Sequence, residues 1–181
     1  MLHASDPVDW APRRILIAGV SGVGKTTLAR RIAQRLGIPH TEIDSLYHGA
    51  GWTPRPEFLR DVEEFSSAAA WVTEWQYRAA RTLLAERADT LVWLDLPLRV
   101  SHWRVIRRTV RRARTQEELW HGNRQPGLWH ALTNRDGIIR WAIATGRTYR
   151  AAVPLAEAEH PHLHVVRLRS QREADEWMSR L

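Results

Sequence analysis

The stretch Gly19-Val20-Ser21-Gly22-Val23-Gly24-Lys25-Thr26 has the spacing G-x-x-x-x-G-K-[ST], which is that of a phosphate-binding loop. Lys25 is the only lysine among the 27 Lys and Arg residues of the chain, so the other 26 are arginines. An ammonium on a thin stem fits beside the β and γ phosphates of a nucleotide, whereas a planar guanidinium is too wide for that space. The use of lysine at this one position therefore indicates a nucleotide site.

Most residues of this loop are expected to contact the nucleotide or its metal ion. The glycines let successive backbone N–H groups turn toward the phosphates, and the helix that begins near Lys25 adds the positive end of its dipole. Thr26 supplies a hydroxyl ligand to Mg²⁺, so we expect ATP and Mg²⁺ as cofactors. The expected nucleotide-binding residues of the loop are Gly19, Ser21, Gly22, Val23, Gly24, Lys25, Thr26 and Thr27.

The sequence on either side of the loop supports this interpretation. Residues 13–18 end in an apolar run typical of a buried strand, and residues 27–36 carry Leu28, Ile32 and Leu36 at helical spacing before Gly37. Strand, glycine-rich loop and helix thus follow in the order that a phosphate-binding loop requires. The structural alternative, a glycine-rich turn with a chance lysine, does not explain that order.

Length and composition indicate one domain spanning residues 1–181. The chain has no cysteine and no apolar run near the roughly 18 residues that cross a membrane. The polar, Pro-containing N-terminus does not resemble a signal peptide and the absence of cysteine fits a reducing compartment, so we expect a cytoplasmic protein. The formal net charge of +7 also invites a nucleic-acid interpretation.

The rest of the chain alternates short apolar segments with amphipathic ones. Strands are predicted at 40–43, 71–75, 90–94 and 164–168. Helices are predicted at 57–69, 78–88, 97–114 and 136–159, with a last helix capped by Ser170. This alternation predicts an α/β fold with a five-stranded parallel sheet and helices on both faces. The segment 115–134 holds Gly122, Pro126 and Gly127 and is expected to be a mobile lid.

The tryptophans are unusually numerous, at ten. Several lie in apolar periodic segments and are expected in the core rather than on the surface as stacking platforms. These are Trp71, Trp93, Trp103 and Trp141.

Five motifs along the chain are shared with a known family. They are the loop 19–27, Ile43-Asp44-Ser45-Leu46-Tyr47 followed by Gly51-Trp52, and the segments 71–78, 88–97 and 166–170. In these motifs, which span nearly the whole chain, the sequence resembles the adenylate-kinase-like P-loop kinases, and within them the topology modulation (FlaR-like) proteins. The resemblance implies a P-loop NTPase fold and transfer of the γ-phosphoryl group of ATP, but it does not fix the acceptor.

Glu74 ends the predicted third strand, where the resemblance implies an aspartate followed by glycine. A carboxylate at this place orients the water ligands of Mg²⁺, so Glu74 is a candidate metal-site residue. Trp75 stands where the glycine is expected and is predicted to leave less room beside the phosphates. The structural alternative is that Glu74 is a solvated charge at the end of a strand.

Asp44 follows the second predicted strand, at the crevice where ligands of open α/β sheets bind. It is a candidate catalytic base that accepts the proton of an acceptor hydroxyl as the phosphoryl group arrives. A phosphate acceptor needs arginines instead, and Arg78 is the candidate clamp for it. The structural alternative for Asp44 is a cap on the segment that follows.

Arginines dominate the predicted helix 97–114. Arg104, Arg108 and Arg111 or Arg112 share one helical face, so one row can point at a nucleotide. The resemblance implies that Arg104 and Arg108 flank the adenine and the phosphates. A solvated basic face is the structural alternative.

Three further positions are assigned by resemblance alone. Arg135 and Arg140 match lid arginines that close onto the transferring phosphoryl group. Arg169 follows the fifth strand, where the adenine-binding loop of the family lies. Asp95 is expected to support neighbouring arginines.

These features favour an ATP-dependent kinase that acts on a small acceptor bearing a hydroxyl, such as a nucleoside, or on a nucleotide. The expected catalytic residues are Lys25, Asp44, Arg108 and Arg135. A nucleotide-dependent, nucleic-acid-binding regulator is the alternative, based on the charge of +7 and the basic helix. The sequence has no recognisable DNA-reading motif.

Replacement of Lys25 by alanine tests the kinase interpretation. We expect Lys25→Ala to lower ATP turnover by at least roughly 10²-fold, the scale of removing one preorganised charge, because no other lysine can reach the phosphates. Turnover within a few-fold of the wild-type rate in a steady-state kinase assay would contradict that interpretation.

Overall fold

Five strands form one parallel sheet, which confirms the predicted α/β architecture. The computed structural model describes residues 1–115, 120–123 and 148–181, without the side chains at 109 and 112–114. The sheet has the order β2-β3-β1-β4-β5, and every strand pair is parallel. The strands are β1 (Arg14–Ala18), β2 (His40–Thr41), β3 (Trp71–Glu74), β4 (Thr90–Leu94) and β5 (His164–Leu168).

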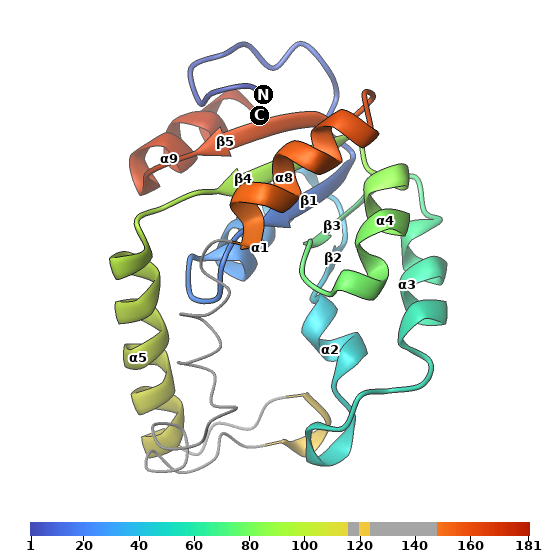
Figure 1. Cartoon of the computed structure of the whole chain (residues 1–181), viewed down its shortest axis with the longest axis vertical. Helices are drawn as coiled ribbons and strands as arrows, with labels where there is room; N and C mark the ends of the chain where they lie inside the picture. The colour runs from blue at the N-terminus through green and yellow to red at the C-terminus, as the bar shows by residue number, and fades with distance from the viewer. Residues whose placement is uncertain (116–119, 124–147) are drawn as a thin grey trace.

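Helices cover both faces of this sheet. The chain leaves β1 toward one edge and later leaves β3 toward the other, so right-handed crossovers put the connecting helices on opposite faces. Figure 1 shows α8 passing in front of the strands and α1 behind them. The helices are α1 (Lys25–Leu36), α2 (Ile43–Tyr47), α3 (Phe58–Ser66), α4 (Arg78–Arg87), α5 (Leu98–Thr115), α8 (Thr148–Glu159) and α9 (Gln171–Arg180).

The central strands are buried over almost their whole length, as expected for parallel strands covered on both faces. Trp71 and Trp93 lie in this core, as predicted. The prediction for Trp103 is wrong, because this side chain is 64% exposed on α5. Trp141 lies outside the described residues. In the part of the chain that the structure describes, no helix combines the length and apolarity needed to cross a bilayer.

The second strand is shorter than predicted. It ends at Thr41, and α2 begins at Ile43, so Asp44 lies in the first turn of a helix and not at the end of a strand. The backbone N–H of Ile43 donates to the Glu74 carboxylate at 3.1 Å, and the N–H of Ser45 donates to the Glu42 carbonyl at 3.0 Å. These bonds turn the chain into a helix one residue before Asp44.

The other predicted helices agree with the structure to within a few residues. The hydroxyl of Ser170 accepts from the Glu173 N–H at 3.1 Å, which confirms the predicted cap of α9. The described part of the predicted helix 136–159 begins at Thr148. Arg135, Arg140 and most of the predicted lid 115–134 lie outside the described residues.

The phosphate-binding loop packs directly under α5. Gly22 has a φ of +76°, and a Cβ built on it would lie 2.6 Å from the Ser101 carbonyl oxygen and 2.4 Å from a Val105 methyl. Both contacts belong to α5, so the helix backbone approaches the loop more closely than any side chain at position 22 would allow. Glycine is required here by its conformation and by this approach.

We expect Gly22→Ala to destabilise the fold more than Gly37→Ala. Both sites have a left-handed φ that costs alanine about 1–2 kcal/mol, but no atom lies within 4 Å of a Cβ at Gly37. The clash with α5 adds about 1–3 kcal/mol for Gly22→Ala. Denaturant unfolding of the two variants measures this difference. Equal losses of unfolding free energy would show that α5 moves away from the added methyl group without cost.

Candidate functional site

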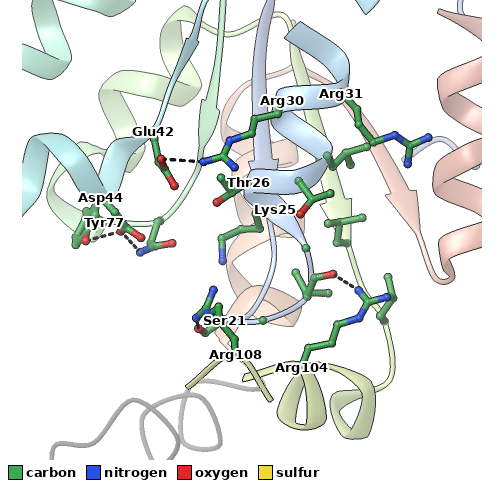
Figure 2. Close-up of a pocket in the computed structure, with 18 of the residues that line it drawn as sticks. Ser21, Lys25, Thr26, Arg30, Arg31, Glu42, Asp44, Tyr77, Arg104 and Arg108 are labelled. Carbon is green, nitrogen blue, oxygen red and sulfur yellow. Dashed lines mark hydrogen bonds and ion pairs between the residues drawn. The ribbon is translucent and has the colours of Figure 1, made fainter. Parts of the chain in front are cut away.

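A cavity of about 1010 Å³ opens at the carboxyl ends of the strands. This is the edge at which open α/β sheets bind ligands. Its walls come from the phosphate-binding loop, α1, α2, the start of α4, α5 and the start of α9, and Figure 2 shows part of this lining. The expected site residues among its lining are Ser21, Gly22, Val23, Gly24, Lys25, Thr26, Thr27, Asp44, Arg78, Arg104 and Arg108.

Lys25 lies at the start of α1 and is buried. Its Nζ donates to the carbonyl oxygens of Gly19 at 2.9 Å and Val20 at 3.2 Å. Burial lowers the pKa of Lys25 from 10.5 to about 8, and the nearby negative charges of Asp44 and Glu74 oppose that shift. The hydrogen bonds of the ammonium go to two backbone carbonyls, in a place where anionic oxygens would stabilise it more strongly.

Glu74 lies behind the cavity wall rather than in it. The side chain is 2% exposed, accepts from the Ile43 N–H at 3.1 Å and lies 3.3 Å from Nε2 of His40. Burial opposes its charged form, but the bonds from His40, Ile43 and the Thr26 hydroxyl outweigh burial and hold the pKa of Glu74 below its usual value. Glu74 thus reaches the cavity through Thr26, which lines it.

The oxygen donors around Thr26 fit a magnesium ion held jointly with nucleotide phosphates. Thr26, Glu42 and Asp44 all line the cavity. Mg²⁺ prefers oxygen ligands, keeps several waters and is usually bound through one or two carboxylates plus substrate phosphates. Among the described residues no three His, Asp or Glu side chains form a metal cluster of their own.

Asp44 is held in place by its neighbours after β3. Its Oδ1 accepts from Nε2 of Gln76 at 2.6 Å and from the Tyr77 hydroxyl at 2.7 Å. The Tyr77 oxygen also lies 3.1 Å from Nε2 of His48. Burial and the charge of Asp44 raise the pKa of Tyr77 well above its ordinary value, so this hydroxyl stays a proton donor to the carboxylate. Burial lowers the pKa of His48, which favours its neutral form.

Arginines of α5 form the opposite wall. Arg104 donates to the Val23 carbonyl at 2.9 Å, and Arg108 lies 3.5 Å from the Ser21 hydroxyl. Arg111 also lines the cavity, so three arginines of the predicted row reach it. In Figure 2, Asp44 and Tyr77 lie on one side of Lys25, and Arg104 lies on the other.

Besides Glu74, the structure places Gly19, Arg169 and Asp95 away from the cavity lining, and Gly19 contributes the carbonyl that accepts from Lys25. The backbone N–H of Arg169 donates to the Glu173 carboxylate at 2.7 Å, and the residues of this segment that line the cavity are Ser170 and Gln171. Asp95 binds the Arg167 guanidinium, with Nε at 3.0 Å, in the supporting role expected of it.

Trp75 is not among the residues that line the cavity. Its side chain is buried, and its indole Nε1 donates to the Arg81 carbonyl at 3.0 Å, so the ring is held under α4. The expectation that it narrows the phosphate site is wrong, because the indole turns out of the cavity.

Sequence reasoning missed several residues that line the cavity. Gln76 and Tyr77 immediately follow the Glu74-Trp75 pair, so their place after a parallel strand was the available signal. Other missed lining residues include Arg30, Arg31, Glu42, Tyr47, His48, Trp52, Arg81 and Trp120. Glu42 and Arg81 lie near the predicted Asp44 and Arg78 along the chain, but no local pattern distinguishes them from solvated charges.

Part of the sequence matches known nucleotide-binding proteins. The ATPase family associated with various cellular activities (AAA) matches residues 15–69, which include the phosphate-binding loop. The cytidylate kinase of Nitratidesulfovibrio vulgaris is 42% identical over 43 residues, which are 24% of this chain. That match covers 18% of the relative, so the chain spans less than a fifth of its length.

Solved kinases share the fold over nearly the whole chain. A gluconokinase from Sinorhizobium meliloti superposes with a TM-score of 0.53 and 22% identity, covering 93% of each chain. A shikimate kinase from Acinetobacter baumannii, in complex with shikimate, gives a TM-score of 0.55 and 17% identity, covering 93% of this chain and 90% of that one. The chain therefore has the α/β fold of P-loop NTPases, and kinases are among its structural neighbours.

Proposed function

We propose that this protein transfers the γ-phosphoryl group of ATP, with Mg²⁺, to a hydroxyl of a small acceptor. The observation that carries the proposal is that Lys25 and a positioned carboxylate, Asp44, line one cavity. The adenylate-kinase-like subtype and the topology modulation group belong to this proposal, and they rest on the shared motifs. The cytidylate kinase match over 43 residues supports the phosphoryl-transfer part of the proposal.

The loop and α5 bind the nucleotide in this proposal. Lys25 exchanges its two carbonyl partners for oxygens of the β and γ phosphates, where the positive end of α1 adds to its charge. Thr26, supported by Glu74, would hold Mg²⁺, which supplies charge neutralisation when it is bound. Arg104 and Arg108 contact the loop from α5 and stabilise the charge of the transferring group. Arg135 is proposed to add a third arginine to this group.

Asp44 receives the proton of the acceptor. The acceptor oxygen attacks the γ phosphorus, the bond from that phosphorus to the bridging oxygen breaks, and ADP leaves with the bridging electron pair. The hydroxyl proton passes to the Asp44 carboxylate. Gln76 and Tyr77 both bind Oδ1, and they thereby fix the plane of the carboxylate.

The basic charge of α5 is better explained by the cavity than by nucleic acid. Arg104, Arg108 and Arg111 line the cavity, and the first two contact the phosphate-binding loop. These residues are three of the six arginines between 104 and 114 on which the nucleic-acid alternative was based. A phosphotransferase is the function that the site supports best.

Replacement of Asp44 by asparagine tests the role of the base. We expect Asp44→Asn to lower phosphoryl transfer to a hydroxyl by about 10²- to 10⁴-fold, because a general base contributes that much, while ATP binding changes little. A coupled assay over a panel of hydroxyl compounds measures transfer, and a thermal shift with a non-hydrolysable ATP analogue measures binding. Glu86→Gln, an exposed carboxylate change on α4, is the control. Equal losses of transfer and of ATP binding would make Asp44 structural.

The lowered pKa of Lys25 predicts proton uptake on nucleotide binding. Phosphate oxygens favour the ammonium, so binding raises the pKa from about 8 and the complex holds more protons than the free protein. We expect uptake of a fraction of a proton at about pH 8.5, and ATP affinity that falls as the pH rises above about 8. Titration calorimetry in two buffers of different ionisation enthalpy measures the uptake. Arg60→Met should leave it unchanged, and an absence of uptake would show that Lys25 is fully charged before the nucleotide arrives.

A further inference from the structure

Arg81 lines the cavity, and two aromatic rings pack against its guanidinium. It lies in the first turns of α4 and lines the cavity on the same side as Gln76, Tyr77 and Arg78. Its guanidinium carbon lies 5.0 Å from the centre of the Trp75 ring and 4.9 Å from the centre of the Tyr149 ring. Two aromatic faces therefore hold one cation in a fixed position.

Hydrogen bonds lock those two rings to the chain and to each other. The Trp75 indole donates to the backbone carbonyl of Arg81 at 3.0 Å, and the Tyr149 hydroxyl donates to the Trp75 carbonyl at 3.1 Å. Trp75 is 3% exposed and Tyr149 is 6% exposed. Little conformational entropy is left for the guanidinium to lose when it binds a ligand.

No carboxylate neutralises this guanidinium within the described part of the chain. Arg30 and Arg31, also in the cavity wall, pair with Glu42 at 3.3 Å and with Asp175 at 2.7 Å. Among the described residues, Arg81 packs on the two rings and forms a side-chain hydrogen bond with Tyr149, and its buried Nε has no hydrogen-bond partner. The positive charge of Arg81 also acts on Lys25 and, like burial, lowers the pKa of that lysine.

A partly buried cation without a counter-ion is costly, and an anionic ligand removes the cost. The planar guanidinium can donate two parallel hydrogen bonds to a carboxylate or to a phosphate. ATP already has a cationic site on the other wall, made by Lys25 and the arginines of α5. Arg81 lies instead four residues after Tyr77, whose hydroxyl donates to Asp44, and both residues line the cavity.

We propose that Arg81 binds an oxyanionic group of the acceptor, so that the acceptor is a hydroxyl-bearing organic anion. The inference rests on the proposed function, because Asp44 defines where the reacting hydroxyl lies. The anion is bound by Arg81 while the hydroxyl faces Asp44, and the two contacts together orient the acceptor for transfer. Trp75 provides part of the support for Arg81.

Matched compounds that differ only in their anionic group test this assignment. The probes are glycerol, glycerate and glycerol phosphate, then ribose, ribonate and ribose phosphate, then adenosine and AMP. Binding of each to the full chain is measured by thermal shift and calorimetry with a non-hydrolysable ATP analogue and Mg²⁺ present, and transfer is measured separately with ATP.

We expect at least one anionic probe to bind more tightly than its neutral counterpart. Arg81→Met should weaken that binding by roughly tenfold to 100-fold, the scale of losing hydrogen bonds to a charged group, and Arg81→Lys should weaken it less. Arg60→Met, at a surface arginine that is 73% exposed, should leave it unchanged. The stabilisation by the ATP analogue should be equal in all these variants, which shows that they fold.

The outcomes separate this inference from the proposed function. Preference for neutral probes, equal binding of anions by Arg81→Met and wild type, or no binding in any set would overturn the role of Arg81. Anion binding that depends on Arg81 but gives no transfer would support that role and contradict the phosphotransferase. Preference between the carboxylate and phosphate members identifies the source of the oxyanion.

Discussion

The buried carboxylate of Glu74 joins the three segments from which the site is built. It lies opposite Ile17 in the register of β3 and β1, so it is fixed to the strand that leads into the phosphate-binding loop. It accepts from the Ile43 N–H at the start of α2 and interacts with the Thr26 hydroxyl and with His40. A charge at this depth is tolerated only with all its partners in place. The loop, the start of α2 and the edge strand must therefore assemble together, and Asp44 is positioned by the same bond that satisfies Glu74.

The net charge of this chain is in large part a property of its cavity. Arginines reach the cavity from α1, α4 and α5. Both of those on α1 have carboxylate partners, and Arg104 donates to a loop carbonyl. A charge of +7 counted over the sequence thus overstates the positive surface offered to a polyanion outside. The arginine-rich composition agrees with the proposed binding of anionic groups in this cavity, where charges are less screened than on an open surface.

Local sequence patterns were sufficient for the fold and for half of the site. The loop motif, the apolar strands and the Ser170 cap are each encoded within a few residues, and the structure confirms the five-stranded parallel sheet and the cap. The second strand was overestimated because a bond from Ile43 to Glu74, far along the chain, ends it early. Trp103 was assigned to the core because periodicity cannot show which face of a helix lacks a neighbour. Arg81 could not be found, because Tyr149 reaches it only through the packing of two helices on one face of the sheet.

The single lysine has a chemical consequence for the whole molecule. Every other cationic side chain is an arginine or a histidine, so the chain offers one side-chain amine to acylating reagents. That amine lies on the cavity wall, and its lowered pKa leaves a larger neutral, nucleophilic fraction than an ordinary lysine has. The N-terminal amine is paired with Glu157. Any acyl group found on a side-chain amine of this protein must therefore lie on Lys25, where the nucleotide phosphates are proposed to bind, and such labelling reports on whether that position is filled.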